Sequence, residues 1–444
     1  MRNGNNPEAI FRQILSYSEA EETEVTVDSI DDSLTRFANN TIHQNVSEEG
    51  ITVSVRVVID RRTASASTNR LDEASLRRTV ETATRLARLQ PPDPDWLPMA
   101  EPRACPPASR FSEKTASLSP EERANTVRAC IAHAEKEKLT AAGIFSTGTS
   151  SVSLFNSRGV AVSHQETSST FSMTVEGETS SGWAKHSAPR VEDFQPEELA
   201  RRAVEKTIES RNPRELPPGK YTVILEPSAV LDLLGFLMFD FGGLSVHEKR
   251  SCLTNRVGQK VFGENITLVD DAYHPLQAGP PFDGEGVPRQ RIPLVERGVV
   301  RNLVYARKTA RRMNTEPTGH GFPLPNGEGE APLNVVSEGG NTSLEEMIQS
   351  TERGILVTRL WYIREVDPYR KLLTGMTRDG TFYVENGKVR YGLRNFRFNE
   401  GLVEMLNRVE RIGPTGRASG EERFDMVGPA LKVREFNFSS VTKF

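Results

Sequence analysis

Apolar and polar residues alternate along several stretches of the chain, as they do in strands with one buried face. The clearest stretch is 51–59, in which Ile51, Val53, Val55, Val57 and Ile59 alternate with mostly polar residues. Shorter strands are expected in a Ser/Thr-rich region, at 152–155, 160–164 and 170–175. These patterns predict half-buried strands in the first half of the chain.

Apolar residues at helical spacing predict helices around these strands. One apolar stripe covers 9–15 after a proline, and another covers 76–87 and ends before the two prolines at 91 and 92. The sequence Ser-Pro-Glu-Glu at 119–122 is a capping box with proline at the first helical position. A further helix is expected over 196–210. Helices and strands together indicate the α+β class.

Proline-rich stretches divide the chain into three parts. Two α/β parts, 1–110 and 111–215, are separated by a Pro-rich linker, and a strand-dominated part, 216–444, begins after Leu-Pro-Pro-Gly. In this last part Asn386 and Gly387 predict a tight hairpin, since Asn-Gly supplies the positive φ angles of a type I′ turn. Three segments are therefore expected, two α/β subsegments followed by a β-rich C-terminal segment.

Composition narrows the class of function. The chain has 444 residues, 36% of them hydrophobic and 26% charged, which is ordinary for a globular protein with several cores. Its net charge of −4 argues against direct nucleic-acid binding, which needs concentrated Lys and Arg. The chain carries no signal-peptide pattern, no apolar run long enough to span a membrane and only three scattered cysteines. A cytoplasmic location is expected.

The stretch 221–271 has the most distinctive organisation. A short strand is stopped by Pro227, an apolar helix follows and ends at Gly242 and Gly243, and a polar stretch leads to a second strand that ends in Asp270 and Asp271. Two further stretches are distinctive as well, LTRFANNTIHQNVSEEGITVSVRV at 34–57 and TRLWYIREVDPYRKLLTGMTRDGTFYVENGKV at 358–389, and LRNFRFNEG follows at 393–401.

These stretches, in this order, resemble the TldD/PmbA family of peptidases, also called modulators of DNA gyrase. The resemblance covers nearly the whole chain. It implies an α/β N-terminal lobe, a barrel-like C-terminal lobe, and dimers arranged around a narrow peptide cleft. In the catalytic branch of the family, the apolar helix carries an HExxxH zinc motif, and a cysteine near the C-terminus supplies the third ligand.

This chain departs from the catalytic pattern at each of those positions. Gly235 and Asp240 stand at the two histidines, and Phe236 stands at the glutamate. Glycine has no side chain and phenylalanine cannot accept a proton, so the donor set that zinc hydrolysis needs is missing. No cysteine follows Cys252, and Ser419 lies near the position of the third ligand. The resemblance is thus to the PmbA/TldE-like branch, and no metal is expected in this chain.

A second arrangement of ligand-type residues competes with this interpretation. His247, Glu248 and Cys252 read as HExxxC, just after the helix. The intervening Lys249 and Arg250 would oppose a cation there, and the sequence resembles the segment that follows the helix in the non-catalytic branch. A surface or cleft loop is the favoured interpretation, and a metal site at His247 and Cys252 is the alternative.

Two more residues are candidates for lining a cleft, His320 in a Gly/Pro-rich loop and Arg364 on a predicted strand. The adjacent acids Asp270 and Asp271 are not expected to act together, since neighbours on a strand point to opposite faces. No phosphate-binding loop and no GxSxG elbow occurs in the sequence.

The leading functional hypothesis is a metal-free, TldE-like subunit of a heterodimeric peptidase that acts on flexible peptides. A TldD-like partner would supply the zinc and the HExxxH motif. Two alternatives remain, an autonomous metal-dependent peptidase that uses His247, Glu248 and Cys252, and a regulatory protein that binds DNA gyrase. The partner could also be a second copy of this chain. Neither direct nucleic-acid contact nor membrane contact is expected.

Overall fold

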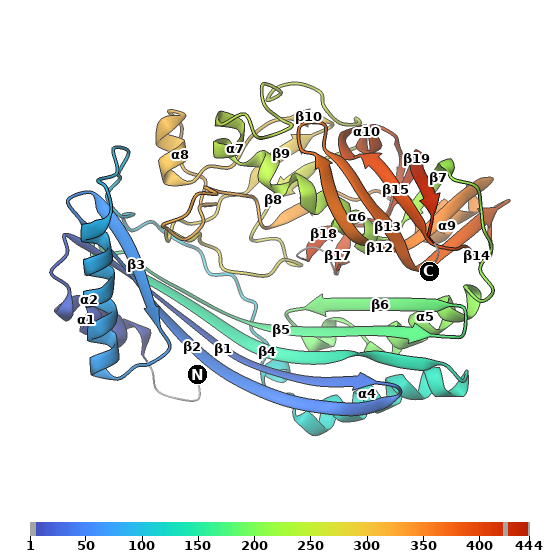
Figure 1. The fold of residues 1–444 in the computed structure, drawn as a ribbon, viewed down its shortest axis with the longest axis horizontal. Coiled ribbons are helices and arrows are strands. Elements are labelled where there is room, and N and C mark those ends of the chain that lie inside the picture. The colour runs from blue at the N-terminus through green and yellow to red at the C-terminus, as the bar shows by residue number, and fades with distance from the viewer. Residues whose placement is uncertain (1–5, 421–424, 443–444) are drawn as a thin grey trace.

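The computed structural model describes residues 6–420 and 425–442 and consists of two lobes (Figure 1). Helices make up 24% of the chain and strands 40%, which confirms the predicted α+β class. In the part of the chain that the structure describes, no helix is long and apolar enough to cross a membrane.

The N-terminal lobe is built on a single antiparallel sheet with the strand order β3-β2-β1-β4-β5-β6. Both α/β subsegments contribute to it, because β1 of the first pairs with β4 of the second over most of their lengths. The strands are β1 (Glu22–Ala38), β2 (Thr41–Ile59), β3 (Arg62–Thr68), β4 (Thr140–Asn156), β5 (Ala161–Glu176) and β6 (Ser181–Ala188).

The helices of this lobe gather mainly at the two ends of the sheet (Figure 1). They are α1 (Pro7–Tyr17), α2 (Glu73–Leu89), α3 (Glu113–Ala116), α4 (Pro120–Lys136), the 3-10 turn η1 (Val191–Asp193) and α5 (Pro196–Glu209). One core cluster forms where α1 and α2 pack on β1 to β3, and a second forms where α4 and α5 pack on β4 to β6. The predicted capping box is present, with Ser119 and Glu122 each accepting a hydrogen bond from the backbone of the other.

The C-terminal lobe contains a closed five-stranded barrel. Its strands are β7 (Gly219–Leu225), β12 (Arg353–Asp367), β13 (Leu372–Glu385), β15 (Phe396–Gly401) and β19 (Leu431–Val441), and pairing of β12 with β13 closes it. Two short strands, β14 (Lys388–Gly392) and β16 (Val409–Ile412), extend the barrel sheet. The predicted hairpin joins β13 to β14, with φ angles of 51° at Asn386 and 74° at Gly387.

A second six-stranded sheet packs beside the barrel, with the order β10-β9-β8-β11-β18-β17. Its strands are β8 (Leu268–Asp270), β9 (Ile292–Glu296), β10 (Val299–Val300), β11 (Val335–Ser337), β17 (Gly416–Ala418) and β18 (Met426–Gly428). The helices of this lobe are α6 (Pro227–Leu234), η2 (Gly235–Phe241), α7 (Gly243–His247), α8 (Arg307–Arg312), α9 (Leu344–Gln349) and α10 (Leu402–Leu406). The largest core cluster of the molecule joins α6 to both sheets.

One predicted element differs in form. The apolar helix of 227–241 is α-helical only to Leu234 and continues from Gly235 as a 3-10 turn to Phe241. Glycine is a poor helix former, and the tighter turn begins at Gly235. The change alters which way the residues after position 234 point, and all three positions that match the zinc motif lie in this turn.

Candidate functional site

The positions that match the zinc motif lie on η2, in the interior of the C-terminal lobe. Gly235 and Asp240 are buried, and Phe236 is half-buried and packs against the main core cluster. Phe236 therefore has a packing role on this turn. Asp240 is the one polar side chain among the three.

Asp240 is held by a lysine from the barrel. The Lys371 ammonium lies 2.5 Å from Asp240 Oδ2 and 2.6 Å from Glu365 Oε1, and both Asp240 and Lys371 are buried. The backbone N–H of Cys252 donates to Asp240 Oδ1 at 2.8 Å, and the Ser251 hydroxyl donates to the Asp240 carbonyl oxygen. The carboxylate thus joins η2, the loop after α7 and the start of β13.

The electrostatics of this pair follow from its burial. Burial raises the pKa of the Asp240 carboxyl, and the attraction of Lys371 and the hydrogen bonds offset only part of that rise. Burial acts to lower the pKa of the Lys371 ammonium, but Asp240 and Glu365 outweigh it and raise that pKa above its ordinary value. A fixed positive charge therefore sits against the one carboxylate that this turn provides.

The donor set at this site does not fit a catalytic zinc ion. Zinc sites need three nitrogen, sulfur or oxygen ligands together with an open position for water. Gly235 provides no ligand, Phe236 provides no base, and the Asp240 carboxylate is occupied by the Lys371 ammonium. Among the residues 6–420 and 425–442, no group of three or more His, Cys, Asp or Glu side chains is arranged to hold a metal ion.

Ser419, near the expected third ligand, does approach the same helix. Its carbonyl oxygen accepts a hydrogen bond from the Ser228 hydroxyl on the first turn of α6, at 2.8 Å. Its hydroxyl accepts from the backbone N–H of Ser187 on β6, at 2.9 Å. A Cβ added at Gly420 would lie 2.4 Å from Leu231 Cδ2, so the backbone runs directly against α6. Ser419 serves here as a hydrogen-bonded link between α6 and the N-terminal lobe.

The alternative metal site, His247 with Glu248 and Cys252, does not form one open coordination shell. His247 and Glu248 are exposed at the end of α7, and Glu248 forms an ion pair with Arg250 at 2.7 Å. Cys252 is 4% exposed, and burial, followed by the neighbouring Asp240, raises the pKa of its thiol. A metal-binding cysteine must be a thiolate, and this environment opposes its formation.

His320 lies in the interior, not at the border of a cleft as its loop sequence suggested. It is 1% exposed, and its ring nitrogens lie 2.9 Å from Asp270 Oδ1 and 2.9 Å from Thr318 Oγ1. The backbone N–H of Asn334 donates to the other oxygen of Asp270. The sequence concealed this pair because His320 and Asp270 are 50 residues apart. Arg364, the other candidate, is exposed on β12 and lies over the exposed Tyr362 ring.

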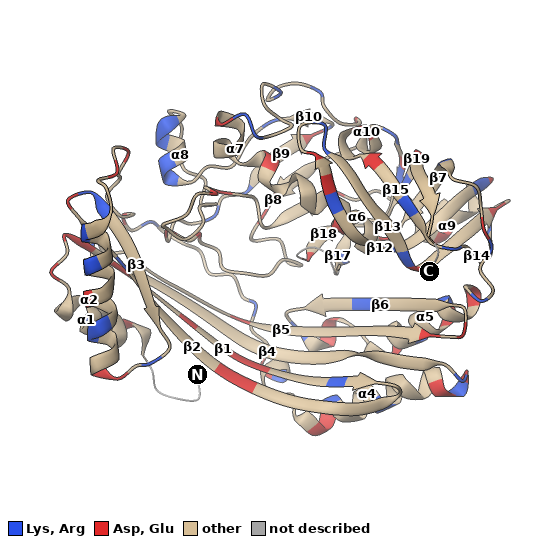
Figure 2. Cartoon of the chain, viewed as in Figure 1, with Lys and Arg blue, Asp and Glu red and all other residues tan. Residues whose placement is uncertain are grey.

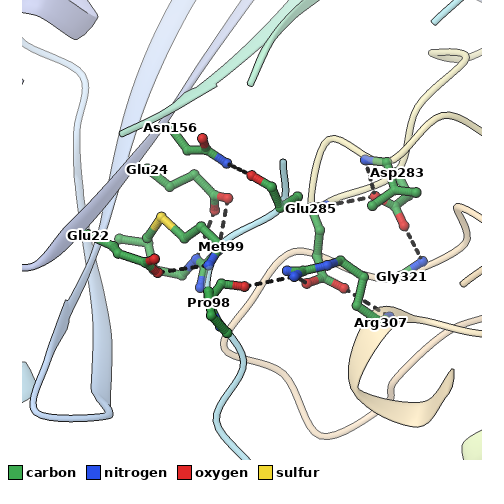
Figure 3. Close-up of polar contacts among 12 residues, drawn as sticks. Glu22, Glu24, Pro98, Met99, Asn156, Asp283, Glu285, Arg307 and Gly321 are labelled. Atoms are coloured by element: carbon green, nitrogen blue, oxygen red, sulfur yellow. Dashed lines mark hydrogen bonds and ion pairs between the residues drawn. The ribbon is translucent and has the colours of Figure 1, made fainter. Parts of the chain in front are cut away.

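Buried carboxylates also gather where the two lobes meet, and no motif or spacing in the sequence pointed to them (Figure 3). Asp283 accepts three backbone hydrogen bonds, from Glu285, Val287 and Gly321. The pKa of the Asp283 carboxyl is raised to about 7, mainly by burial and secondly by the charge of Glu285. Glu285 accepts from the backbone and guanidinium of Arg307, both at 3.3 Å, and burial raises its pKa as well.

The Pro-rich linker passes through this junction and is bonded to both lobes (Figure 3). Arg307 on α8 donates to the Pro98 carbonyl oxygen at 2.7 Å, and the Met99 N–H donates to Glu22 on β1 at 2.7 Å. On the N-terminal side, Arg56 and Glu24 form a buried, bidentate ion pair at 2.8 Å. The linker is therefore an ordered part of the lobe junction.

Comparison with known proteins assigns this sequence and fold to a family. The sequence matches the models of the PmbA/TldA metallopeptidase domain 1 at residues 23–87, of the central domain at 113–211 and of the C-terminal domain at 218–440. It is 31% identical over 278 residues to an uncharacterised protein of Methanocaldococcus jannaschii, an alignment that covers 59% of this chain and 62% of that protein. It is 25% identical over 378 residues to the metalloprotease PmbA of Escherichia coli, covering 81% of this chain and 80% of the relative.

Solved structures show the same fold. The TldE structure from Thermococcus kodakarensis superposes with a TM-score of 0.89 at 23% identity, covering 97% of this chain and 99% of the other. A Thermotoga maritima protein described as a candidate modulator of a DNA gyrase superposes with a TM-score of 0.86 at 21% identity, covering 97% of this chain and all of the other. The matches to the family models span most of the sequence, and the chain belongs to the PmbA/TldD metallopeptidase family.

Proposed function

We infer that this chain is the non-catalytic, TldE-like subunit of a heterodimeric zinc metallopeptidase that acts on flexible peptides. The observation that supports this most is the ion pair between Asp240 and Lys371. It places an ammonium group against the only ligand-type side chain at the three positions of the family's zinc motif. The zinc and its general base would come from a TldD-like partner, and this chain would complete the peptide cleft and stabilise the active subunit.

The test is to assay peptide cleavage with separated and recombined subunits. The chain would be purified alone, a TldD-like family member would be purified alone, and each would be incubated with an unstructured peptide before and after mixing. We expect no cleavage by this chain alone, and stable association and faster cleavage after mixing. As a matched control, Gly235→Ala in this chain should leave the stimulation intact, because glycine at this position is not part of the chemistry.

Other outcomes would support the alternatives. Cleavage by the chain alone that disappears in both His247→Ala and Cys252→Ala would identify an autonomous peptidase. The exposure of His247 and the burial of Cys252 oppose that outcome. Recovery of gyrase on the immobilised chain, without a TldD-like subunit, would favour the regulatory role suggested by the description of the Thermotoga relative.

A further inference from the structure

The outer edge of the N-terminal sheet is unpaired along a long part of β2. On this side β2 pairs with β3 only from Val53 to Ile59, although the strand begins at Thr41. Within the described part of the chain, residues 41–52 have no strand beside them on that edge, which Figure 1 shows as the free side of β2. We call residues 41–52 the β2 edge.

A free edge of this length is unusual in a stable protein. It offers a row of backbone N–H and C=O groups to any extended chain, and proteins protect such edges with lysine, proline, bulges or covering loops. The β2 edge contains neither lysine nor proline, and nine of its twelve residues are exposed, 41 and 43–49 among them. Its acidic residues are Glu48 and Glu49, and it contains no Lys or Arg. The edge is suited to pair with another strand.

The same part of the sheet carries two acidic pairs directly opposite each other across β1 and β2. Asp31 faces Glu49, and Asp32 faces Glu48. Opposed like charges on neighbouring strands destabilise a sheet. Among the described residues no Lys or Arg forms an ion pair with any of the four, and Figure 2 shows the acidic residues together in the middle of β1 and β2.

The electrostatic cost of this arrangement is visible at Asp32. Burial raises the pKa of its carboxyl, and the charges of Asp31 and Glu48 raise it further. Because strand neighbours point to opposite faces, Glu48 and Asp32 lie on one face of the sheet and Glu49 and Asp31 on the other. Each face thus carries one acidic pair beside the free edge.

One of these faces also has a hollow of about 450 Å³. Its apolar lining includes Val27, Ile51 and Phe111, and its acidic lining consists of Asp31, Glu49 and Glu113. No Lys or Arg lines it. The hollow therefore suits the long aliphatic part and terminal charge of a Lys or Arg side chain.

From the edge, the two acidic pairs and the hollow, we propose that the β2 edge binds an extended peptide segment that carries two consecutive Lys or Arg residues. The segment pairs with β2 as an added strand. Its two basic side chains point to opposite faces, one toward Glu48 and Asp32 and the other toward Glu49 and Asp31. A second copy of this chain is a poor occupant, because the same edge would bring more acidic residues to the site.

This inference rests on the proposed function only in taking the segment to be part of the peptide substrate. Binding at the edge is a property of this chain alone and does not require the zinc-bearing partner. Binding of a basic segment can therefore be tested with this chain alone, separately from the identity of the peptide substrate.

The experiment is a fluorescence-anisotropy titration of the full chain with labelled ten-residue peptides. One peptide carries a central Lys-Arg pair among Thr, Val and Ser, a second has Gln-Gln in place of the pair, and a third has proline beside the pair to prevent strand pairing. We expect the Lys-Arg peptide to bind, with affinity that falls as salt is raised, and both other peptides to bind at least several-fold more weakly.

Variants of the chain assign the binding to the edge. Glu48→Gln combined with Glu49→Gln should weaken binding of the Lys-Arg peptide by about threefold to tenfold, the range for partly exposed ion pairs. The same change relieves the repulsion from Asp31 and Asp32, so the melting temperature should stay equal or rise. Glu316→Gln, at an exposed acid outside any helix or strand, is the matched control and should change neither quantity.

Equal binding of the Lys-Arg and Gln-Gln peptides would overturn the proposal, as would unchanged binding by the double Glu→Gln variant. Cleavage of a neutral peptide by the recombined complex tests the proposed function separately. If that cleavage occurs and the edge does not bind basic peptides, the subunit assignment stands and this inference fails. If the edge binds and no complex forms, the site exists in a protein with a different role.

Discussion

Replacing Lys371 by Met removes the charge that neutralises Asp240 and keeps a side chain of similar length. Asp240 would then be a buried carboxylate that has lost its neutralising charge and keeps the hydrogen bond from the Cys252 N–H, at 2.8 Å. Breaking a buried ion pair by removing one partner costs about 3–5 kcal/mol of unfolding free energy. We expect a loss of this size in Lys371→Met.

Removing the charge of Asp240 should cost less unfolding free energy than removing that of Lys371, and this asymmetry makes the prediction specific to this geometry. In Asp240→Asn, Lys371 keeps Glu365 at 2.6 Å, and Glu365 is 30% exposed to water. The amide oxygen can still accept from Cys252, so we expect a loss of about 1–2 kcal/mol. In the double variant neither charge is stranded, and its loss should be smaller than the sum of the two single losses by about 1–3 kcal/mol.

The assay is urea unfolding of the four proteins, followed by tryptophan fluorescence, with the slope and midpoint of each transition compared. Losses that add within experimental error would mean that Asp240 and Lys371 do not interact in the folded protein. A loss below about 1 kcal/mol in Lys371→Met, the range for exposed pairs, would also refute the buried ion pair.

Three further predictions concern other parts of the fold. The pKa of Asp283 is raised from 3.8 to about 7, so between these pH values the folded protein holds a proton that the unfolded chain has released, and the stability that this proton provides is lost as pH rises from 3.8 to 7. In a pH series of urea midpoints, Glu285→Gln should flatten this decline, because the charge of Glu285 adds to the rise in the Asp283 pKa. An unchanged slope would contradict the coupling between the two carboxyl groups. Gly182→Ala would place a Cβ 2.2 Å from a carbonyl oxygen of α5 and should cost about 1–3 kcal/mol by calorimetry, whereas an unchanged melting temperature would show that the helix can move away. His320→Ala should cost about 3 kcal/mol in urea unfolding, because it removes the imidazole from the fully buried Asp270, and a loss near zero would show that the pair contributes nothing.

Periodicity predicted the elements whose signals are local. The alternation at 51–59 and the capping box at 119–122 are both present, and so is the Asn386-Gly387 turn. Strand lengths were underestimated, because β1 and β2 run through 22–59 with a polar middle that carries no alternation of hydrophobicity. Residues 43–49 in that polar middle are all exposed, so burial does not impose a pattern on them.

The candidate site could be predicted only where residues match a motif. Gly235, Phe236 and Asp240 were identified because they stand at the positions of the family's zinc motif. The lysine that forms an ion pair with Asp240 is Lys371, 131 positions later in the sequence. The buried carboxylates Asp283 and Glu285 were missed for a related reason, since each is stabilised by backbone groups or by residues distant in sequence. Long-range contacts of this kind leave no spacing that a single sequence reveals.

Metal analysis of the purified protein shows whether this chain binds a catalytic zinc ion. The chain would be equilibrated with excess zinc, separated from free metal by gel filtration and measured by elemental mass spectrometry, with a zinc-bearing TldD-like protein treated in parallel. We expect no stoichiometric zinc in this chain and one zinc ion in the TldD-like protein. One zinc ion per chain that is lost in His247→Ala or Cys252→Ala would contradict this expectation.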